Sequence, residues 1–142
     1  MDDKEFEVIM KKLESTVFRY YNNNPHHKQT EDCVIRAIAA GTGKSWEEVT
    51  RELTEYMIET GYMINTPELY GKYLQNIGWI KQKQPSHPNK KKMRVKDFVK
   101  QFDGNAVINV GRNHVSYVAD GRLWDIWNCE DEIVGVYWTP KK

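Results

Sequence analysis

The 142-residue sequence has only two cysteines, Cys33 and Cys129. Two cysteines are too few for a disulfide scaffold, and neither belongs to a CxxC pair of the kind that holds structural zinc. The four histidines, His26, His27, His87 and His114, show no HExxH spacing. We therefore expect neither a metal site nor a bound cofactor.

Long apolar runs and an excess of one charge are also missing. No segment approaches the roughly 18 apolar residues of a membrane-spanning helix, and the N-terminus lacks the basic and apolar regions of a signal peptide. Lys and Arg number 21 against 20 Asp and Glu, so no global field draws the chain to nucleic acid. These absences predict a cytoplasmic protein with no membrane partner, and the balanced charge argues against a nucleic-acid partner.

Aromatic residues, by contrast, are abundant at 12% of the chain. Disordered chains are poor in such residues, and 142 residues correspond to one ordinary domain. We expect a single domain over 1–142, with a helical part at about 1–80, a basic loop at about 81–94 and a sheet part at about 95–142.

The first 80 residues show helical periodicity and helix-terminus signals. Ser45 and Glu48 form a capping box, and Thr66-Pro67 is typical of a helix start. Apolar residues at three- and four-residue steps predict an amphipathic helix before Asn22. The helices predicted in this way, together with a short one near the sheet part, cover 3–21, 33–40, 46–60, 67–77 and 95–102.

The C-terminal part has the composition of β-strands. Four runs rich in β-branched and aromatic residues lie at 106–110, 114–119, 123–127 and 133–138. Asp120-Gly121, between two of them, is typical of a two-residue hairpin turn. We predict an α+β fold in which N-terminal helices pack on a C-terminal antiparallel β-meander.

The segment between these parts is basic. Residues 81–96 include seven Lys or Arg and no acidic residue. A solvated surface loop is the simpler interpretation, and a surface for an anionic partner is the alternative.

The predicted hairpin brings polar side chains together. A turn at Asp120-Gly121 places His114, Ser116, Asp125 and Trp127 on one face, with Asp125 diagonal to His114. A carboxylate in that position can accept the ring N–H and stabilise the imidazolium. A hairpin loop of odd length would instead turn Asn128 toward His114.

Cys33 is expected in the first turn of a helix. The positive end of the helix dipole, together with a nearby imidazolium, would favour its thiolate, although an inert buried thiol is the other interpretation. Cys129 precedes Glu130, Asp131 and Glu132, whose charge would disfavour a thiolate, so we expect it to take no part in chemistry.

Two stretches, EDCVIRAIAAGTGKSWEEV and NHVSYVADGRLWDIWN, resemble the papain-like cysteine peptidase superfamily. The similarity is greatest to small bacterial and phage-type members and to bacteriocin-processing peptidase domains, and it spans roughly residues 24–138. It implies a papain-like fold and a peptide or protein substrate. Val34 stands where the bacteriocin-processing domains usually carry Gly, so no particular cleavage specificity is implied.

The resemblance also implies roles for individual residues. Cys33 would be the nucleophile, His114 the general base and Asp125 the group that orients His114. The oxyanion would be held by the Cys33 N–H and a side chain of the preceding loop, either Gln29 or Asn24. Apart from the resemblance, Trp127 is a candidate for lining a substrate cleft, as are Trp124 and Trp138, and the alternative at strand spacing is a core or rim position.

Other functions are compatible with the same residues. A deamidase or transglutaminase would use the same three groups. A non-catalytic module could keep the fold and bind a protein or nucleic acid through the basic loop.

Overall fold

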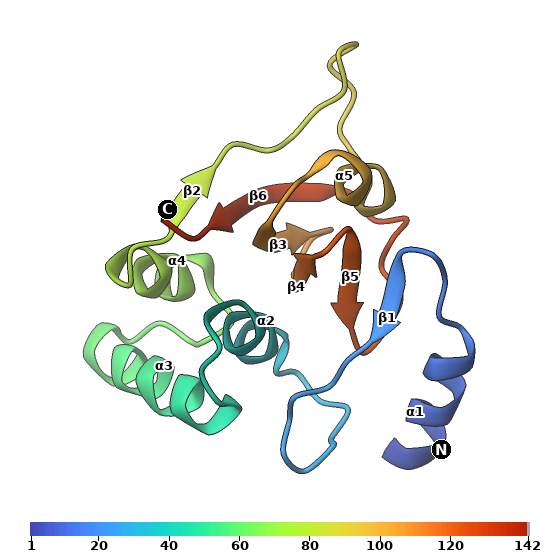
Figure 1. The fold of residues 1–142 in the computed structure, drawn as a ribbon. Coiled ribbons are helices and arrows are strands. Elements are labelled where there is room, and N and C mark those ends of the chain that lie inside the picture. Colours follow the sequence, from blue (N-terminus) through green and yellow to red (C-terminus); the bar gives the residue numbers. More distant parts are fainter. Residues whose placement is uncertain (142) are drawn as a thin grey trace.

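The computed structural model describes residues 1–141, which form five helices and six strands (Figure 1). The helices are α1 (Asp3–Lys12), α2 (Cys33–Thr42), α3 (Trp46–Thr60), α4 (Pro67–Asn76) and α5 (Val95–Gln101). The strands are β1 (Phe18–Tyr20), β2 (Ile80–Gln82), β3 (Asn105–Val110), β4 (His114–Ala119), β5 (Arg122–Asp125) and β6 (Val134–Thr139). The predicted α+β class is confirmed. Among the described residues, no helix has the length and apolar character needed to cross a membrane.

All six strands belong to one mixed sheet in the order β1-β5-β4-β3-β6-β2. Strands β3, β4 and β5 form the predicted meander, but β6 pairs with β3 rather than with β5. The outer edge of β5 is taken by β1, which runs parallel to it and pairs Phe18 with Leu123. The prediction of a wholly antiparallel, consecutive meander was therefore wrong, because hydrogen bonds from a distant N-terminal strand occupy that edge.

The predicted helix over 3–21 is also wrong, since α1 ends at Lys12. Ser15 turns the chain by accepting hydrogen bonds from the backbone N–H groups of Val17 and Phe18. Phe18 is then fully buried in strand β1. Burial of this aromatic residue against the sheet outweighs the helical spacing of the segment.

Two apolar cores lie on the two faces of the sheet. Helices α2, α3 and α4 enclose one of them, in which Ile38, Leu53 and Leu74 pack against Val107 and Trp138. Helix α5 covers the other face, where its apolar residues pack with β1 and the remaining inward-facing strand residues. Helix α1 lies at the edge beside β1 and has no buried residue (Figure 1).

Local signals in the sequence are confirmed at several element ends. Asp120 and Gly121 have φ angles of 56° and 70°, as a type I′ turn requires, and Ala119 pairs with Arg122. The Ser45 side chain caps α3 by accepting a hydrogen bond from the Glu48 N–H. Helix α2 continues past the predicted stop at Gly41 and ends at Thr42, followed by a C-cap at Gly43, whose φ is 75°.

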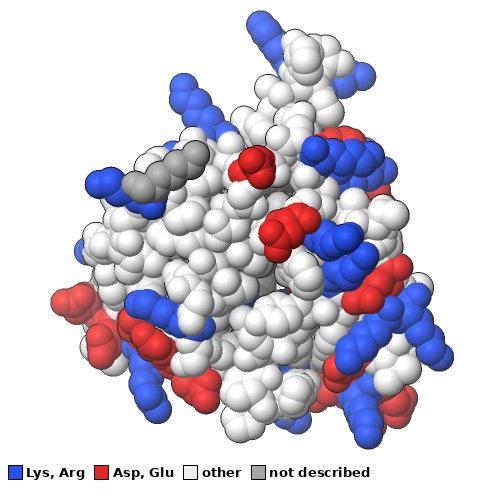
Figure 2. Space-filling view, viewed as in Figure 1, with Lys and Arg blue, Asp and Glu red and all other residues white. Residues whose placement is uncertain are grey.

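Most of the basic segment is a projecting turn (Figure 1). Lys81 belongs to β2, whereas Lys90, Lys91 and Lys92 are exposed beyond it. The turn is held by hydrogen bonds from His87 N to Lys91 O and from Lys90 N to His87 O, both 2.8 Å. Figure 2 shows the basic side chains of this projection standing clear of the body of the molecule.

Candidate active site

His114 and Asp125 meet at one end of the β4–β5 hairpin. His114 begins β4 and Asp125 ends β5, and the predicted register brings His114 Nε2 to 2.6 Å from Asp125 Oδ2. Ser116, two residues after His114 on the same face, donates a hydrogen bond of 2.5 Å to the same carboxylate oxygen. The hairpin turn therefore determines the relative positions of the imidazole and its carboxylate.

The other carboxylate oxygen of Asp125 also accepts two hydrogen bonds. Asp125 Oδ1 accepts hydrogen bonds from the Ile126 N–H at 2.7 Å and from Arg36 Nη1 at 2.9 Å. Burial alone would raise the pKa of Asp125, but bonding to His114 and the positive charges of His114 and Arg36 outweigh it and lower the pKa. Asp125 is thus an ionised, almost completely buried carboxylate.

Arg36 links this carboxylate to helix α2. Its Nε lies 2.7 Å from Asp32 Oδ1, while Asp32 Oδ2 accepts bonds from Trp46 Nε1 and Asn24 Nδ2. Burial opposes the charge on Arg36, but Asp125 and Asp32 outweigh it and raise its pKa. Arg36 is not among the residues predicted from the sequence, although Asp32 and Arg36 have the four-residue spacing at which side chains of opposite charge meet along a helix.

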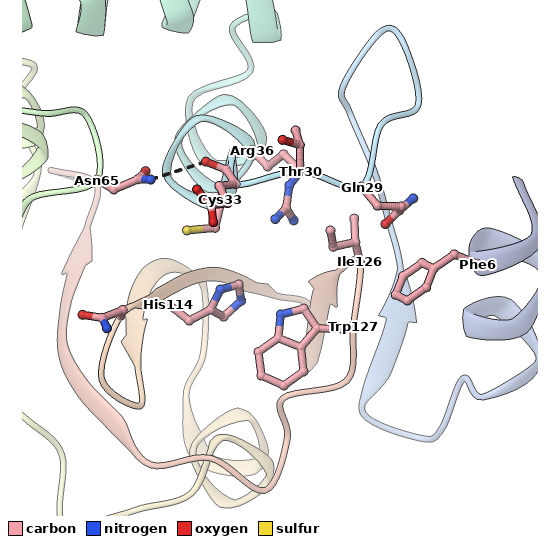
Figure 3. A pocket seen from close by; sticks show the side chains of 11 residues that line it. Phe6, Gln29, Thr30, Cys33, Arg36, Asn65, His114, Ile126 and Trp127 are labelled. Carbon is pink, nitrogen blue, oxygen red and sulfur yellow. Dashed lines mark hydrogen bonds between the residues drawn. The ribbon is translucent and has the colours of Figure 1, made fainter. Parts of the chain in front are cut away.

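Cys33 is the first residue of α2, as predicted. Cys33 is partly exposed, and its thiol is among the groups that raise the pKa of His114, so the two side chains are close neighbours. Figure 3 shows both of them at the pocket, with the sulfur on the side of α2 that faces β4. Since His114 uses Nε2 for Asp125, its Nδ1 is free to exchange a proton with this thiol.

The surroundings of His114 favour its charged form. Burial lowers the pKa of the imidazole, but the bond to Asp125 and contacts with the Cys129 and Cys33 thiols outweigh burial and raise it to about 11. An imidazolium therefore faces the Cys33 side of the site at neutral pH. With His114 charged, two cations and two carboxylates balance in the cluster of Asp32, Arg36, His114 and Asp125.

Cys129 lies in the same cluster, which the sequence did not predict. Its buried Sγ is 3.8 Å from Asp125 Oδ2. The pKa of Cys129 is raised, in the predicted direction, but the main cause is burial and the charged neighbour is Asp125 rather than the acidic run that follows Cys129. A protonated, buried thiol at this point packs beside the carboxylate.

The donor atoms of His114, Asp125 and Cys129 lie within 4.8 Å of one another, close enough to consider a metal ion. However, Asp125 already accepts bonds on both oxygens, and Arg36 places a positive charge beside it. These contacts favour an imidazolium over a metal cation at this point.

A pocket of about 610 Å³ opens in front of Cys33 and His114 (Figure 3). Gln29 and Trp127, both predicted near the site, line this pocket. Gln29 Nε2 donates to the Tyr20 hydroxyl at 2.8 Å, and Trp127 packs against His114 with ring centroids 5.0 Å apart.

Two predicted residues are placed elsewhere. Asn24 is buried beneath the loop, where its side chain donates to Asp32 and accepts from the His26 N–H, so it does not reach the pocket. The Asn128 side chain bonds to Glu130 rather than to His114. The choice of Asp125 over Asn128 as the partner of His114 therefore agrees with the hairpin register.

Protein-family models, curated proteins and solved structures give no match.

Proposed function

We propose that this protein is a cysteine hydrolase of amide bonds, with Cys33 as nucleophile, His114 as general base and acid, and Asp125 as the residue that positions His114. The observation that carries the proposal is the short contact between His114 Nε2 and the buried Asp125 carboxylate. This contact leaves Nδ1 for the thiol and stabilises the imidazolium beside it.

The proposed reaction begins from a Cys33 thiolate beside the His114 imidazolium, a pair in which the proton already lies on His114. The thiolate then attacks the carbonyl carbon, forming a C–S bond and a tetrahedral oxyanion. Collapse of this intermediate breaks the C–N bond, and His114 gives its proton to the leaving nitrogen. Water, deprotonated by His114, hydrolyses the thioester and restores Cys33.

Two N–H groups are candidates for holding the oxyanion. The Cys33 N–H begins α2, where backbone donors lack an intrahelical acceptor. Gln29 lines the pocket and uses one amide hydrogen on Tyr20, which leaves a second. His114 could protonate the leaving nitrogen of a peptide bond or of a side-chain amide. The proposal therefore covers both a peptidase and a deamidase.

The experiment that tests it is the rate of iodoacetamide alkylation at Cys33 against pH, followed by mass spectrometry. We expect a rate that stays nearly constant from pH 6 to 8, because the imidazolium stabilises the thiolate. In His114→Ala the rate should fall about tenfold per pH unit below pH 8.5, as for an ordinary thiol. Cys129 is an internal control that should stay unmodified in the folded protein, since it is buried.

An identical pH profile in the wild type and in His114→Ala would contradict the proposal. If Cys33 and His114 form a thiolate–imidazolium pair but the protein hydrolyses no amide, the proposed hydrolase activity would also be contradicted. Turnover is checked by mass spectrometry of peptide libraries incubated with the wild type and with Cys33→Ala.

A second candidate function is a binding module, favoured by the projecting basic turn. Among the described residues, Lys90, Lys91 and Lys92 have no carboxylate within ion-pair distance, and the backbone of the turn is held by its own hydrogen bonds. This function predicts an anionic partner. The affinity of the protein for that partner should fall steeply as the salt concentration rises, and Cys33→Ala should leave it unchanged.

A further inference from the structure

The pocket in front of Cys33 has two chemically different walls. On one side lies the amide side chain of Asn65 (Figure 3), and a second amide, that of Asn113, also lines the pocket. On the other side lie Phe6, Ile126 and Trp127. Figure 3 shows the Phe6 ring, which comes from α1, pointing toward Trp127 and Ile126, with Cys33 and His114 beyond them.

Phe6 is held at this wall although α1 is peripheral. Asp3 Oδ1 accepts a hydrogen bond of 3.1 Å from the Gln29 N–H, and Asp3 Oδ2 lies 3.4 Å from Lys28 Nζ. These contacts attach the first turn of α1 to the loop that leads into Cys33. The position of Phe6 is therefore fixed relative to the loop that precedes Cys33.

Trp127 is held from the opposite direction. Its ring packs against His114 at a centroid distance of 5.0 Å and an interplanar angle of 52°. Both Phe6 and Trp127 are only half-buried, whereas Ile126 is 7% exposed and closes the wall between them. Two aromatic faces beside the nucleophile thus keep apolar surface open to the pocket.

We infer that Phe6, Ile126 and Trp127 form an apolar subsite that takes an aromatic or large aliphatic side chain next to the attacked amide. The identity of the reacting group rests on the proposed function. Covering two half-buried aromatic faces with an apolar side chain removes their surface from water, which is favourable in proportion to the area covered. Exposed Glu31, which also lines the pocket, disfavours an acidic side chain at this position.

The test compares two reagents that alkylate the same thiol, iodoacetamide and N-benzyl iodoacetamide. Each rate constant at Cys33 is divided by the rate constant of that reagent with free cysteine at the same pH. The ratio of these two normalised values does not depend on how much Cys33 is thiolate. A failure of the subsite is therefore distinct from a failure of the proposed function. The latter would give both reagents the pH profile of an ordinary thiol, the same in the wild type and in His114→Ala.

We expect the benzyl reagent to be preferred about tenfold by the wild type, the size of effect that partial burial of a phenyl ring produces. Phe6→Ala should reduce the preference to about twofold or less, and Phe6→Leu should restore most of it by refilling the wall. Val8→Ala is the matched control, since Val8 lies on α1 but is 47% exposed and does not line this pocket. A wild-type ratio near one, or a ratio that Phe6→Ala leaves unchanged, would overturn the inference.

Discussion

Arg36 Nη1 lies 2.9 Å from Asp125 Oδ1, so the helix that begins with Cys33 is ion-paired to the strand whose carboxylate binds His114. Both side chains are almost completely buried. The pair therefore does more than neutralise charge. It sets where the N-terminus of α2 lies relative to the end of β5, and with it the separation of the thiol and the imidazole.

Loss of Arg36 should destabilise the protein strongly. Arg36→Met leaves the carboxylates of Asp32 and Asp125 buried without their shared cation, a change that typically costs about 3–5 kcal/mol of unfolding free energy. The measurement is chemical denaturation followed by tryptophan fluorescence. Arg51→Met, at an exposed position of α3, is the control and should change the unfolding free energy by less than about 0.5 kcal/mol. Equal effects of the two substitutions would contradict the role assigned to Arg36.

Asp125→Asn should weaken the reactivity of Cys33 without changing the shape of the site. An amide at this position can still bond to the ring but cannot stabilise its positive charge, so the alkylation rate at pH 6 should fall about tenfold or more. Asn128→Ala should leave that rate unchanged, because the Asn128 side chain bonds only to Glu130. The reverse result would make Asn128 the partner of His114.

The charge cluster should also make stability depend on pH. The pKa of folded His114, about 11, is above its ordinary value of 6.5, so its stabilisation is complete below pH 6.5 and is lost as pH rises toward 11. The lowered pKa of Asp125 acts in the opposite sense, with stabilisation lost as the pH falls below the ordinary range of a carboxyl group.

Denaturation at pH 6 and pH 9 tests the His114 contribution. His114→Gln, which has no titrating ring, is the reference. From pH 6 to pH 9, we expect the unfolding free energy of the wild type to fall by on the order of 3 kcal/mol more than that of His114→Gln. The difference between the two proteins cancels the other titrating groups. A loss of the same size in both would show that His114 is not held as a cation.

Two alanine substitutions can distinguish strand β1 from the helix that was predicted over the same residues. Phe18 is fully buried against Leu123 and its neighbours, so Phe18→Ala should cost about 3–5 kcal/mol. Leu13 lies five residues earlier and is 56% exposed, so Leu13→Ala should cost about 0.5 kcal/mol or less. Thermal unfolding of both variants gives the comparison, and similar shifts would place Phe18 on an exposed helix face instead.

The features that the sequence alone determined are local. The type I′ turn at Asp120-Gly121 fixes which residues face each other across the hairpin, and so brings His114 and Asp125 together within eleven residues of chain. The start of α3 at Ser45 and the position of Cys33 at the first turn of α2 follow from neighbouring residues in the same way. Each depends on backbone conformation and hydrogen bonds over a few residues, which composition and spacing describe.

Only the tertiary structure decided the long-range parts of the molecule. Strand β1 replaces a predicted helical turn because the edge of β5 and the core beneath it offer Phe18 more burial than a helix would. Arg36 and Asp125 are 89 residues apart in the chain, and Phe6 is brought to the pocket by contacts of Asp3 with the loop before Cys33. Such contacts form between surfaces that exist only once the elements have packed, so no local pattern in the sequence contains them.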